Sequence, residues 1–139
     1  MFKRVLIPLD GSENAEKVLP AVDRILKVEG ARAVLVRAVY CPLAGNPHEA
    51  TILGELEKSA VSYLADTAGR LKRSASDVET RVLHGDPAKS ILRTAQEESC
   101  DLIAMTTHGH RFLADIVLGS TIEAVRHKAH IPLLIVRAE

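Results

Sequence analysis

Short apolar runs alternate along this chain with longer segments in which apolar residues recur every three or four positions. The apolar runs are of strand length and occupy residues 3–9, 33–40, 78–84, 102–106 and 131–136. The periodic segments between them predict helices over about residues 12–28, 49–72, 86–99 and 120–128. Because strands and helices alternate with short connections, the pattern predicts an α/β fold, an open parallel sheet with helices on both faces.

The predicted strands differ in how continuously apolar they are. Residues 33–40, AVLVRAVY, are nearly all apolar, which is typical of a parallel strand buried on both faces. Residues 78–84, VETRVLH, alternate between apolar and polar side chains, so we expect this strand nearer an edge of the sheet.

Residues with strong capping preferences mark the ends of the predicted helices. Ser12 is a good N-cap for the first helix, and Gly30 marks the end of that helix. Asp86 is the expected N-cap of the third helix, with Pro87 as its first residue.

Composition narrows the class of protein. The 139 residues are expected to form a single domain, residues 1–139, with a sizeable core. Eighteen basic residues balance eighteen acidic ones and Trp is absent, so nothing favours nucleic acid or an acidic membrane surface. The first apolar run is too short for a signal peptide, no window is apolar enough for a membrane span, and Cys41 and Cys100 form no metal motif. We therefore expect a cytoplasmic protein with reduced thiols.

Residues 101–121, DLIAMTTHGHRFLADIVLGST, carry the pattern most typical of a ligand site. A short apolar strand leads through Thr106 to Gly109, and Gly119-Ser120 follow after nine intervening residues. Ser120 and Glu123 have the S-x-x-E spacing of a capping box, so the fourth helix is expected to begin at Ser120. A strand that runs through a glycine-bearing loop into a helix N-terminus offers backbone N–H groups to an anion, which makes phosphate the first ligand to consider.

Other candidate residues come after the first two strands. In an open α/β sheet ligands bind at the carboxyl ends of the strands, where residues 8–10, 39–40 and 105–109 would converge. Asp10 could accept hydrogen bonds from ribose hydroxyls, although an aspartate that only caps its own turn is an equal alternative. His108 is more typical of a loop brace than of a catalytic base, and Arg111 could reach a terminal phosphate.

Several enzyme motifs are absent from the sequence. It contains no G-x-x-x-x-G-K-[ST] loop and no G-x-G-x-x-G fingerprint, so neither a Walker-type NTPase nor a dinucleotide-dependent enzyme is supported. It also lacks the G-x-S-x-G elbow of α/β-hydrolases. The sequence thus favours a binding protein over a true enzyme.

Three blocks of sequence are similar to the universal stress protein family and together cover essentially the whole chain. They are VLIPLDGSENAEKVLP at the start, VLHGDPAKSIL in the middle, and DLIAMTTHG with LGSTIEAVRHKAHIPLLIVR at the end. ATP-binding members of that family show G-x-x-G, nine residues and then G-[ST], which corresponds here to Thr106-x-x-Gly109, nine residues and Gly119-Ser120. The resemblance implies a Rossmann-like five-stranded parallel sheet of order 3-2-1-4-5.

The resemblance also implies a site for an adenine nucleotide, foremost ATP with Mg²⁺ or Mn²⁺ held through its phosphates. Its predicted residues wall the adenine and ribose (Pro8, Leu9, Asp10, Val39 and Met105) or hold the phosphates (Gly109, Gly119, Ser120 and Thr121). Thr106 replaces the first glycine of the motif, and its side chain is expected to crowd the sugar and weaken or adjust binding. Phe112 is a second departure, because a smaller residue would be easier to fit in this loop.

Members of the family are commonly homodimers, and the sequence offers a local reason. The strand from Ile131 to Val136 would be an apolar edge, which invites pairing with a second copy of the chain. A helix or loop that covers this edge is the alternative.

Three functions remain open from the sequence. The first is a cytoplasmic stress-response or signalling protein that binds an adenine nucleotide at the carboxyl ends of strands one, two and four. The second is a dimeric interaction module of the same fold that binds no nucleotide. The third is a slow ATPase or an autokinase that uses Asp10 or His108.

Overall fold

The protein is an α/β structure in which strands and helices alternate along the chain. The computed structural model describes residues 1–40, 45–107 and 116–138, and it gives residues 116–119 by their backbone alone. The strands are β1 (Arg4–Pro8), β2 (Arg32–Val39), β3 (Asp77–His84), β4 (Leu102–Thr107) and β5 (Leu133–Arg137). The helices are the 3₁₀ turn η1 (Ala15–Val18), α1 (Leu19–Glu29), α2 (Glu49–Leu71), α3 (Pro87–Glu97) and α4 (Ile116–Lys128).

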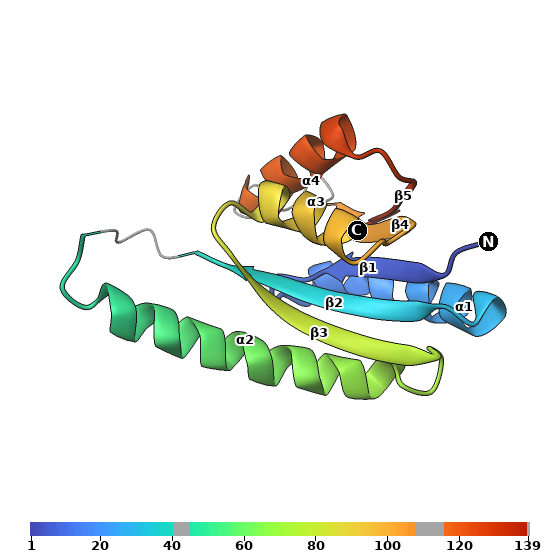
Figure 1. Ribbon diagram of the computed structural model, residues 1–139, viewed down its shortest axis with the longest axis horizontal. Coiled ribbons are helices and arrows are strands. Elements are labelled where there is room, and N and C mark those ends of the chain that lie inside the picture. The colour runs from blue at the N-terminus through green and yellow to red at the C-terminus, as the bar shows by residue number, and fades with distance from the viewer. Residues whose placement is uncertain (41–44, 108–115, 139) are drawn as a thin grey trace.

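The five strands form one parallel sheet of order β3-β2-β1-β4-β5, which confirms the expected order. The chain winds outward from β1 to β3, returns to β4 beside β1, and ends at β5 on the opposite edge (Figure 1). The strand order therefore reverses between β1 and β4, the point at which open α/β sheets bind ligands. The half-polar strand β3 lies at an edge, as its alternation predicted.

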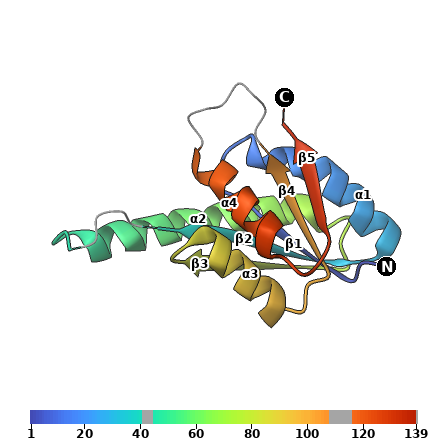
Figure 2. The same cartoon turned by 90° about the horizontal axis from the view of Figure 1, so that it is seen from above.

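Helices cover both faces of the sheet, as the alternating order predicted. Figures 1 and 2 show α2 running along one side of the sheet while α3 and α4 lie together on the other. The right-handed crossovers expected of parallel strands put α1 on the same side as α2.

The core coincides with the apolar runs read from the sequence. All side chains of β1 after Arg4 are buried, as are Ala33 to Val36 in β2. Helices α1 and α2 contribute apolar side chains from one side, and α3 and α4 from the other. The central strands are thus buried on both faces, which explains their lack of apolar–polar alternation.

Two of the predicted helix boundaries are confirmed. Gly30 takes a left-handed conformation at the end of α1, with φ of 65°, and its N–H donates to the carbonyl of Leu26. Asp86 is the N-cap of α3, and its side chain accepts a hydrogen bond of 2.9 Å from the N–H of Lys89.

The first helix begins later than Ser12, contrary to the sequence prediction. Ser12 Oγ accepts a 3.1 Å hydrogen bond from the N–H of Ala15, but the next element is the single 3₁₀ turn η1, and α1 starts only at Leu19. Pro20 in the first turn of α1 accounts for the interruption, because proline has no N–H to continue the hydrogen-bond ladder from η1.

The fourth helix begins earlier than predicted. It starts at Ile116 rather than at Ser120, so Gly119 and Ser120 lie inside it. A single internal glycine costs a helix only about 1 kcal/mol, and the preceding Ile-Val-Leu contains no helix breaker, so the helix extends through the S-x-x-E pattern. The N–H groups without a partner inside α4 therefore belong to residues before Gly119. Ser120 and Thr121 lie in the hydrogen-bonded body of the helix.

Candidate functional site

A small cavity lies where the carboxyl ends of β1 and β2 meet α3 and α4. Its volume is about 80 Å³, and most of its wall is apolar. It is lined by Pro8, Leu9, Asp10, Val36, Ala38, Pro87, Ile91 and Thr121. The structure thus brings four of the predicted site residues together: Pro8, Leu9, Asp10 and Thr121.

A larger cavity adjoins the small one between α3 and α4. Its volume is about 760 Å³, and it shares Pro87 and Thr121 with the smaller cavity. It is lined by Tyr40, Asp86, Pro87, Ala88, Lys89, Leu92, Ser120, Thr121, Ala124 and Lys128. Ser120 is therefore a fifth predicted site residue that the structure places at these cavities. The larger cavity also contains two lysines, Lys89 and Lys128.

The end of β1 is held in place by backbone and side-chain hydrogen bonds. The N–H of Leu9 donates to the carbonyl of Val36 at 2.9 Å, which extends the pairing of β1 with β2 to the rim of the small cavity. Asp10 Oδ1 then accepts hydrogen bonds from Ser12, at 2.9 Å from its N–H and 2.6 Å from its hydroxyl. Asp10 therefore caps its own turn through one oxygen, while the carboxylate as a whole is exposed at the cavity.

The start of α3 sets the charge of the larger cavity. Because the Asp86 carboxylate accepts from the N–H of Lys89, the first turn of α3 is fixed and the side chain of Lys89 lines the cavity. Lys128, from the last turn of α4, adds a second positive charge. Sequence reasoning assigned neither lysine to the site, and it treated residues 85–87 only as a helix start. The rule that ligands gather at the carboxyl ends of strands applies equally to β3 and could have found Lys89.

Three other predicted residues do not line these cavities. Val39 and Met105 are buried, and Val39 lies on the opposite face of β2 from Val36 and Ala38 because side chains alternate along a strand. Thr106 is 2% exposed, and its hydroxyl donates a 2.9 Å hydrogen bond to the carbonyl of Ala15.

The remaining predicted residues are not tested by the structure. His108, Gly109 and Arg111 lie outside the described residues, as does Phe112. Gly119 lies in α4, where the backbone alone is described.

A basic side chain that sequence reasoning missed lies behind the turn after β1. The guanidinium of Arg37 stands over the ring of Tyr63, 5.2 Å from its centroid, and it packs so closely on Gly11 that an added Cβ would lie 2.8 Å from Nη1. Gly11 has φ of 87°, a conformation that favours glycine. The turn that carries Asp10 is thus closed on one side by Arg37.

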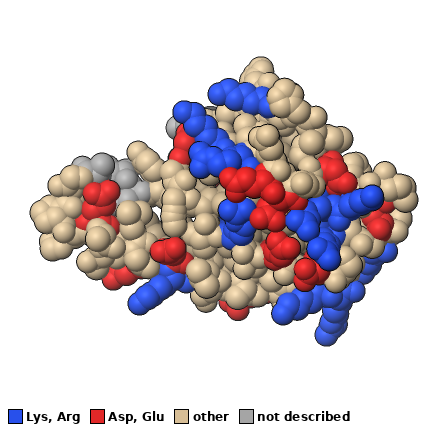
Figure 3. Space-filling model, in the orientation of Figure 1, with Lys and Arg blue, Asp and Glu red and all other residues tan. Residues whose placement is uncertain are grey.

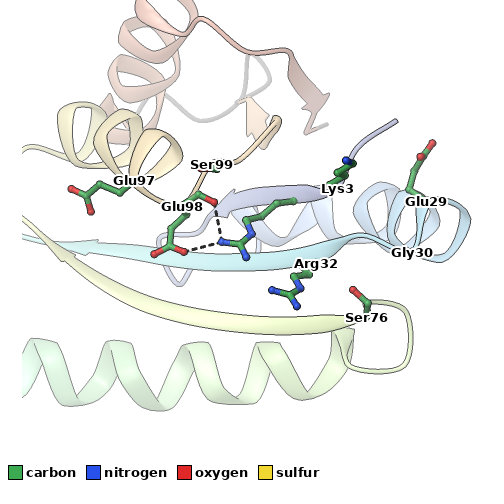
Figure 4. A pocket seen from close by; sticks show the side chains of 9 residues that line it. Lys3, Glu29, Gly30, Arg32, Ser76, Glu97, Glu98 and Ser99 are labelled. Atoms are coloured by element: carbon green, nitrogen blue, oxygen red, sulfur yellow. Dashed lines mark hydrogen bonds and ion pairs between the residues drawn. The ribbon is translucent and has the colours of Figure 1, made fainter.

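The amino ends of the strands carry a different kind of cavity, shown in Figure 4. It measures about 520 Å³, and Arg4 lies within it with its guanidinium 3.1 Å from Glu98. Glu98 also pairs with Arg81 at 2.9 Å. Because these charges neutralise one another, we regard this end of the sheet as held together by ion pairs rather than as a ligand site.

Within residues 1–40, 45–107 and 116–138 no group of three or more His, Cys, Asp or Glu side chains is arranged to hold a metal ion. No helix in those ranges is both long and apolar enough to cross a membrane.

Comparison with known sequences gives the family. Residues 1–137 match the sequence profile of the Universal stress protein family. The chain belongs to the universal stress protein family. A relative from Methanocaldococcus jannaschii, Universal stress protein MJ0531, is 31% identical over 144 residues, which cover 99% of this chain and 83% of the relative.

Solved universal stress proteins share the fold over the full chain. The structure of MJ0577 of Methanocaldococcus jannaschii is 27% identical with a TM-score of 0.87, and the match covers 100% of this chain and 98% of that one. A universal stress protein solved in complex with cAMP is 22% identical with a TM-score of 0.75, covering 99% and 98% of the two chains. More distant relatives of the same fold have been solved with AMP, from Arabidopsis thaliana, and with dAMP, from Archaeoglobus fulgidus. Structural relatives of this universal stress protein therefore bind adenine nucleotides.

Proposed function

We propose that this universal stress protein is a cytoplasmic, single-domain stress-response or signalling protein that binds an adenine nucleotide, with ATP as its ligand. The two cavities lie at the carboxyl ends of β1 and β2 beside α3 and α4, and the nucleotide is proposed to extend from them to the end of β4. The observation that carries the proposal is the pairing of two adjoining, largely apolar cavities, of which the larger also carries Lys89 and Lys128.

The chemistry of the two cavities suits the two halves of a nucleotide. Pro8, Val36 and Ile91 offer apolar surface to a base, while Lys89 and Lys128 offer positive charge to phosphates. The hydroxyls of Ser120 and Thr121 line the cationic cavity and are suited to phosphate oxygens. Mg²⁺ or Mn²⁺ would be held through the phosphates, since protein sites for Mg²⁺ commonly use substrate phosphates and few carboxylates.

Turnover of the nucleotide is expected to be slow. Of the acidic side chains that line the two cavities, Asp86 is used to cap α3 and Asp10 is hydrogen-bonded to Ser12. Both carboxylates are thus held by their local turns, and each retains a second oxygen that no described side chain positions for catalysis. A slow ATPase or autokinase activity would use Asp10 or His108, of which His108 lies outside the described residues.

Calorimetry on nucleotide-free protein tests the proposal. ATP with Mg²⁺ should bind, and the substitution Lys89→Ala should weaken binding about tenfold, which corresponds to the roughly 1.4 kcal/mol of a charge-assisted contact. Lys58→Ala is the matched control, because Lys58 is exposed on α2, on the other face of the sheet. The absence of both heat and thermal stabilisation at millimolar ATP would contradict nucleotide binding.

The second candidate, a homodimeric interaction module, is favoured by the exposed apolar surface of β5. This strand forms an edge of the sheet, and Ile135 is 36% exposed on it. An apolar edge is stabilised when a second copy pairs with it, so we propose a homodimer through the strand from Ile131 to Val136. Analytical ultracentrifugation should show a dimer that Ile135→Asp dissociates. Val61→Asp, at a site 55% exposed on α2, should leave the dimer intact.

A further inference from the structure

A third cavity lies between the C-terminal halves of α3 and α4, at the other end of these helices from Asp86. Its volume is about 550 Å³, within the range of roughly 300–1,000 Å³ typical of small-molecule sites. Its apolar wall is formed by Leu92, Ala95, Cys100, Ile103, Ala129 and Ile131. Ala95, Cys100 and Ile103 are buried, so the floor of the cavity belongs to the core.

The remaining lining residues make the cavity positively charged. Arg93 and Lys128 carry the charge and are exposed along it, His130 is exposed beside them and can donate a hydrogen bond, and Gln96 and Ser99 are neutral. No carboxylate is among its lining residues. Figure 3 shows Lys and Arg side chains gathered over α3 and α4, whereas acidic and basic side chains are interspersed across the middle of the same face.

The acidic residues that flank the cavity in sequence are bound elsewhere. Glu98 pairs with Arg4 and Arg81, and Asp101 accepts hydrogen bonds from the N–H groups of Lys3 and Arg4. Glu97 pairs with Arg81 at 3.4 Å, and Glu123 pairs with Arg126 at 3.0 Å. In the part of the chain that the structure describes, no ion pair involves Arg93 or His130. Lys128 lies in the last turn of α4, where the helix dipole stabilises a positive charge. Arg93 lies in the middle of α3, where the helix dipole does not stabilise a cation.

The thiol within the cavity contributes apolar surface rather than reactivity. Cys100 is 5% exposed, and burial raises the pKa of its thiol to about 11. The thiol is therefore neutral at physiological pH, and it packs as a small apolar group.

We propose that this cavity binds a small amphiphilic carboxylate, with its hydrocarbon part against the apolar wall and its carboxylate at the rim formed by Arg93 and His130. An apolar floor beside uncompensated positive charge is complementary to a molecule with an apolar body and one anionic end. A cationic ligand would meet no carboxylate there. The cavity adjoins the proposed nucleotide site and shares Leu92 and Lys128 with it, but its charged rim at Arg93 and His130 is its own.

Titration of the full chain with decanoate, monitored by two-dimensional ¹H–¹⁵N NMR, tests the proposal. Amide shifts are expected at Ala95, Cys100, Ile103 and Ala129. The double substitution Arg93→Glu/His130→Glu should weaken binding about tenfold, because it sets like charges against the carboxylate. Lys58→Glu on α2 is the matched charge reversal and should leave the affinity unchanged.

A second variant removes space instead of charge. Ala129→Leu at the wall of the cavity should also weaken decanoate binding, and its thermal unfolding shows whether the fold is intact. Equal binding of decanol and decanoate would overturn the proposal, because the charged rim would then play no part. No binding below the micellar range of decanoate, or shifts confined to other surfaces, would overturn it as well. None of these three outcomes decides whether ATP binds, which calorimetry measures separately.

Discussion

The hydroxyl of Thr106 donates a hydrogen bond to the backbone carbonyl of Ala15 at 2.9 Å, and both residues are buried. This bond joins the end of β4 to η1, two segments far apart in the sequence. Thr106 stands where ATP-binding universal stress proteins have the first glycine of their motif. Its side chain packs towards η1 and lines neither cavity at the carboxyl ends of the strands.

Thr106→Val should destabilise the protein. Valine keeps the shape of threonine but leaves the buried carbonyl of Ala15 without its donor, which costs about 1–3 kcal/mol. Urea unfolding measures the change in free energy. Thr80→Val, on an exposed side chain of β3, is the control and should change the free energy by less than about 0.5 kcal/mol. Equal stability of the two variants would show that the hydrogen bond contributes nothing.

Thr106→Gly, which restores the family motif, should lower stability without tightening ATP binding. The threonine side chain that this substitution removes is hydrogen-bonded to Ala15 in η1 and lines neither cavity. Its loss therefore opens no space in either cavity. Calorimetry with ATP and Mg²⁺ on both proteins checks this. A markedly tighter variant would mean that Thr106 does crowd the sugar, as the sequence pattern suggested.

Gly11→Ala should destabilise the turn that carries Asp10. Its φ of 87° costs an L-residue about 1–2 kcal/mol, and the new Cβ would push the guanidinium of Arg37 away from the ring of Tyr63. Gly54→Ala in α2 is the contrasting case, because nothing lies within 4 Å of its added Cβ and helical alanine is favoured by about 0.5–1 kcal/mol. In urea unfolding, Gly11→Ala should lower the free energy of unfolding and Gly54→Ala should raise it. Changes of the same sign in the two variants would contradict this interpretation.

Asp86→Ala should weaken the start of α3. Loss of the side-chain acceptor for the N–H of Lys89 is expected to lower the free energy of unfolding by about 1 kcal/mol. Asp86→Asn keeps an oxygen acceptor and should be nearly neutral. If the two variants are equally destabilised, the negative charge rather than the cap is what stabilises α3.

Glu16 should make stability depend on pH. Burial raises the pKa of this carboxyl, but hydrogen bonds from Arg70 at 2.6 Å and from Tyr63 at 2.8 Å outweigh it and lower the pKa below its ordinary 4.5. A lowered pKa in the folded state stabilises the protein above pH 4.5, and this contribution is lost as the pH falls through the folded-state value.

Glu16→Gln is the variant that reveals this dependence. Wild type should be the more stable at neutral pH, and the gap should narrow below pH 4.5 as Glu16 becomes protonated. Chemical unfolding at a series of pH values measures the gap. A gap that stays constant into acid would show that the carboxylate is not specifically stabilised in the folded state.

The capping signals in the sequence succeeded where a helix has one possible start and failed where it has two. Asp86-Pro87 has no helix-compatible residues before it, since Gly85 has φ of 91°, and α3 starts there. Ser120 and Glu123 fit a capping box, but Ile116 to Leu118 include no residue that breaks a helix, so the helix begins upstream. A local motif states where a helix can begin, while the neighbouring residues decide whether it has already begun.

The candidate site was predictable in part. Pro8, Leu9 and Asp10 come at the end of a strand that the sequence marks as buried, so their gathering at the carboxyl end of the sheet was expected. Lys89 and Lys128 were not expected, because they come from α3 and α4 and their convergence depends on how these two helices pack together.

The apolar runs and their spacing were sufficient to determine the parallel sheet, its alternation with helices and the burial of its central strands. These properties follow from the periodicity of apolar residues within short stretches of the chain, which can be read directly from the sequence. Only the tertiary structure decided that Thr106 faces Ala15, that Val36 and Ala38 rather than Val39 line the small cavity, and that a cationic hollow remains between α3 and α4. Those outcomes depend on contacts between segments distant in sequence, whose geometry no single stretch of the chain specifies.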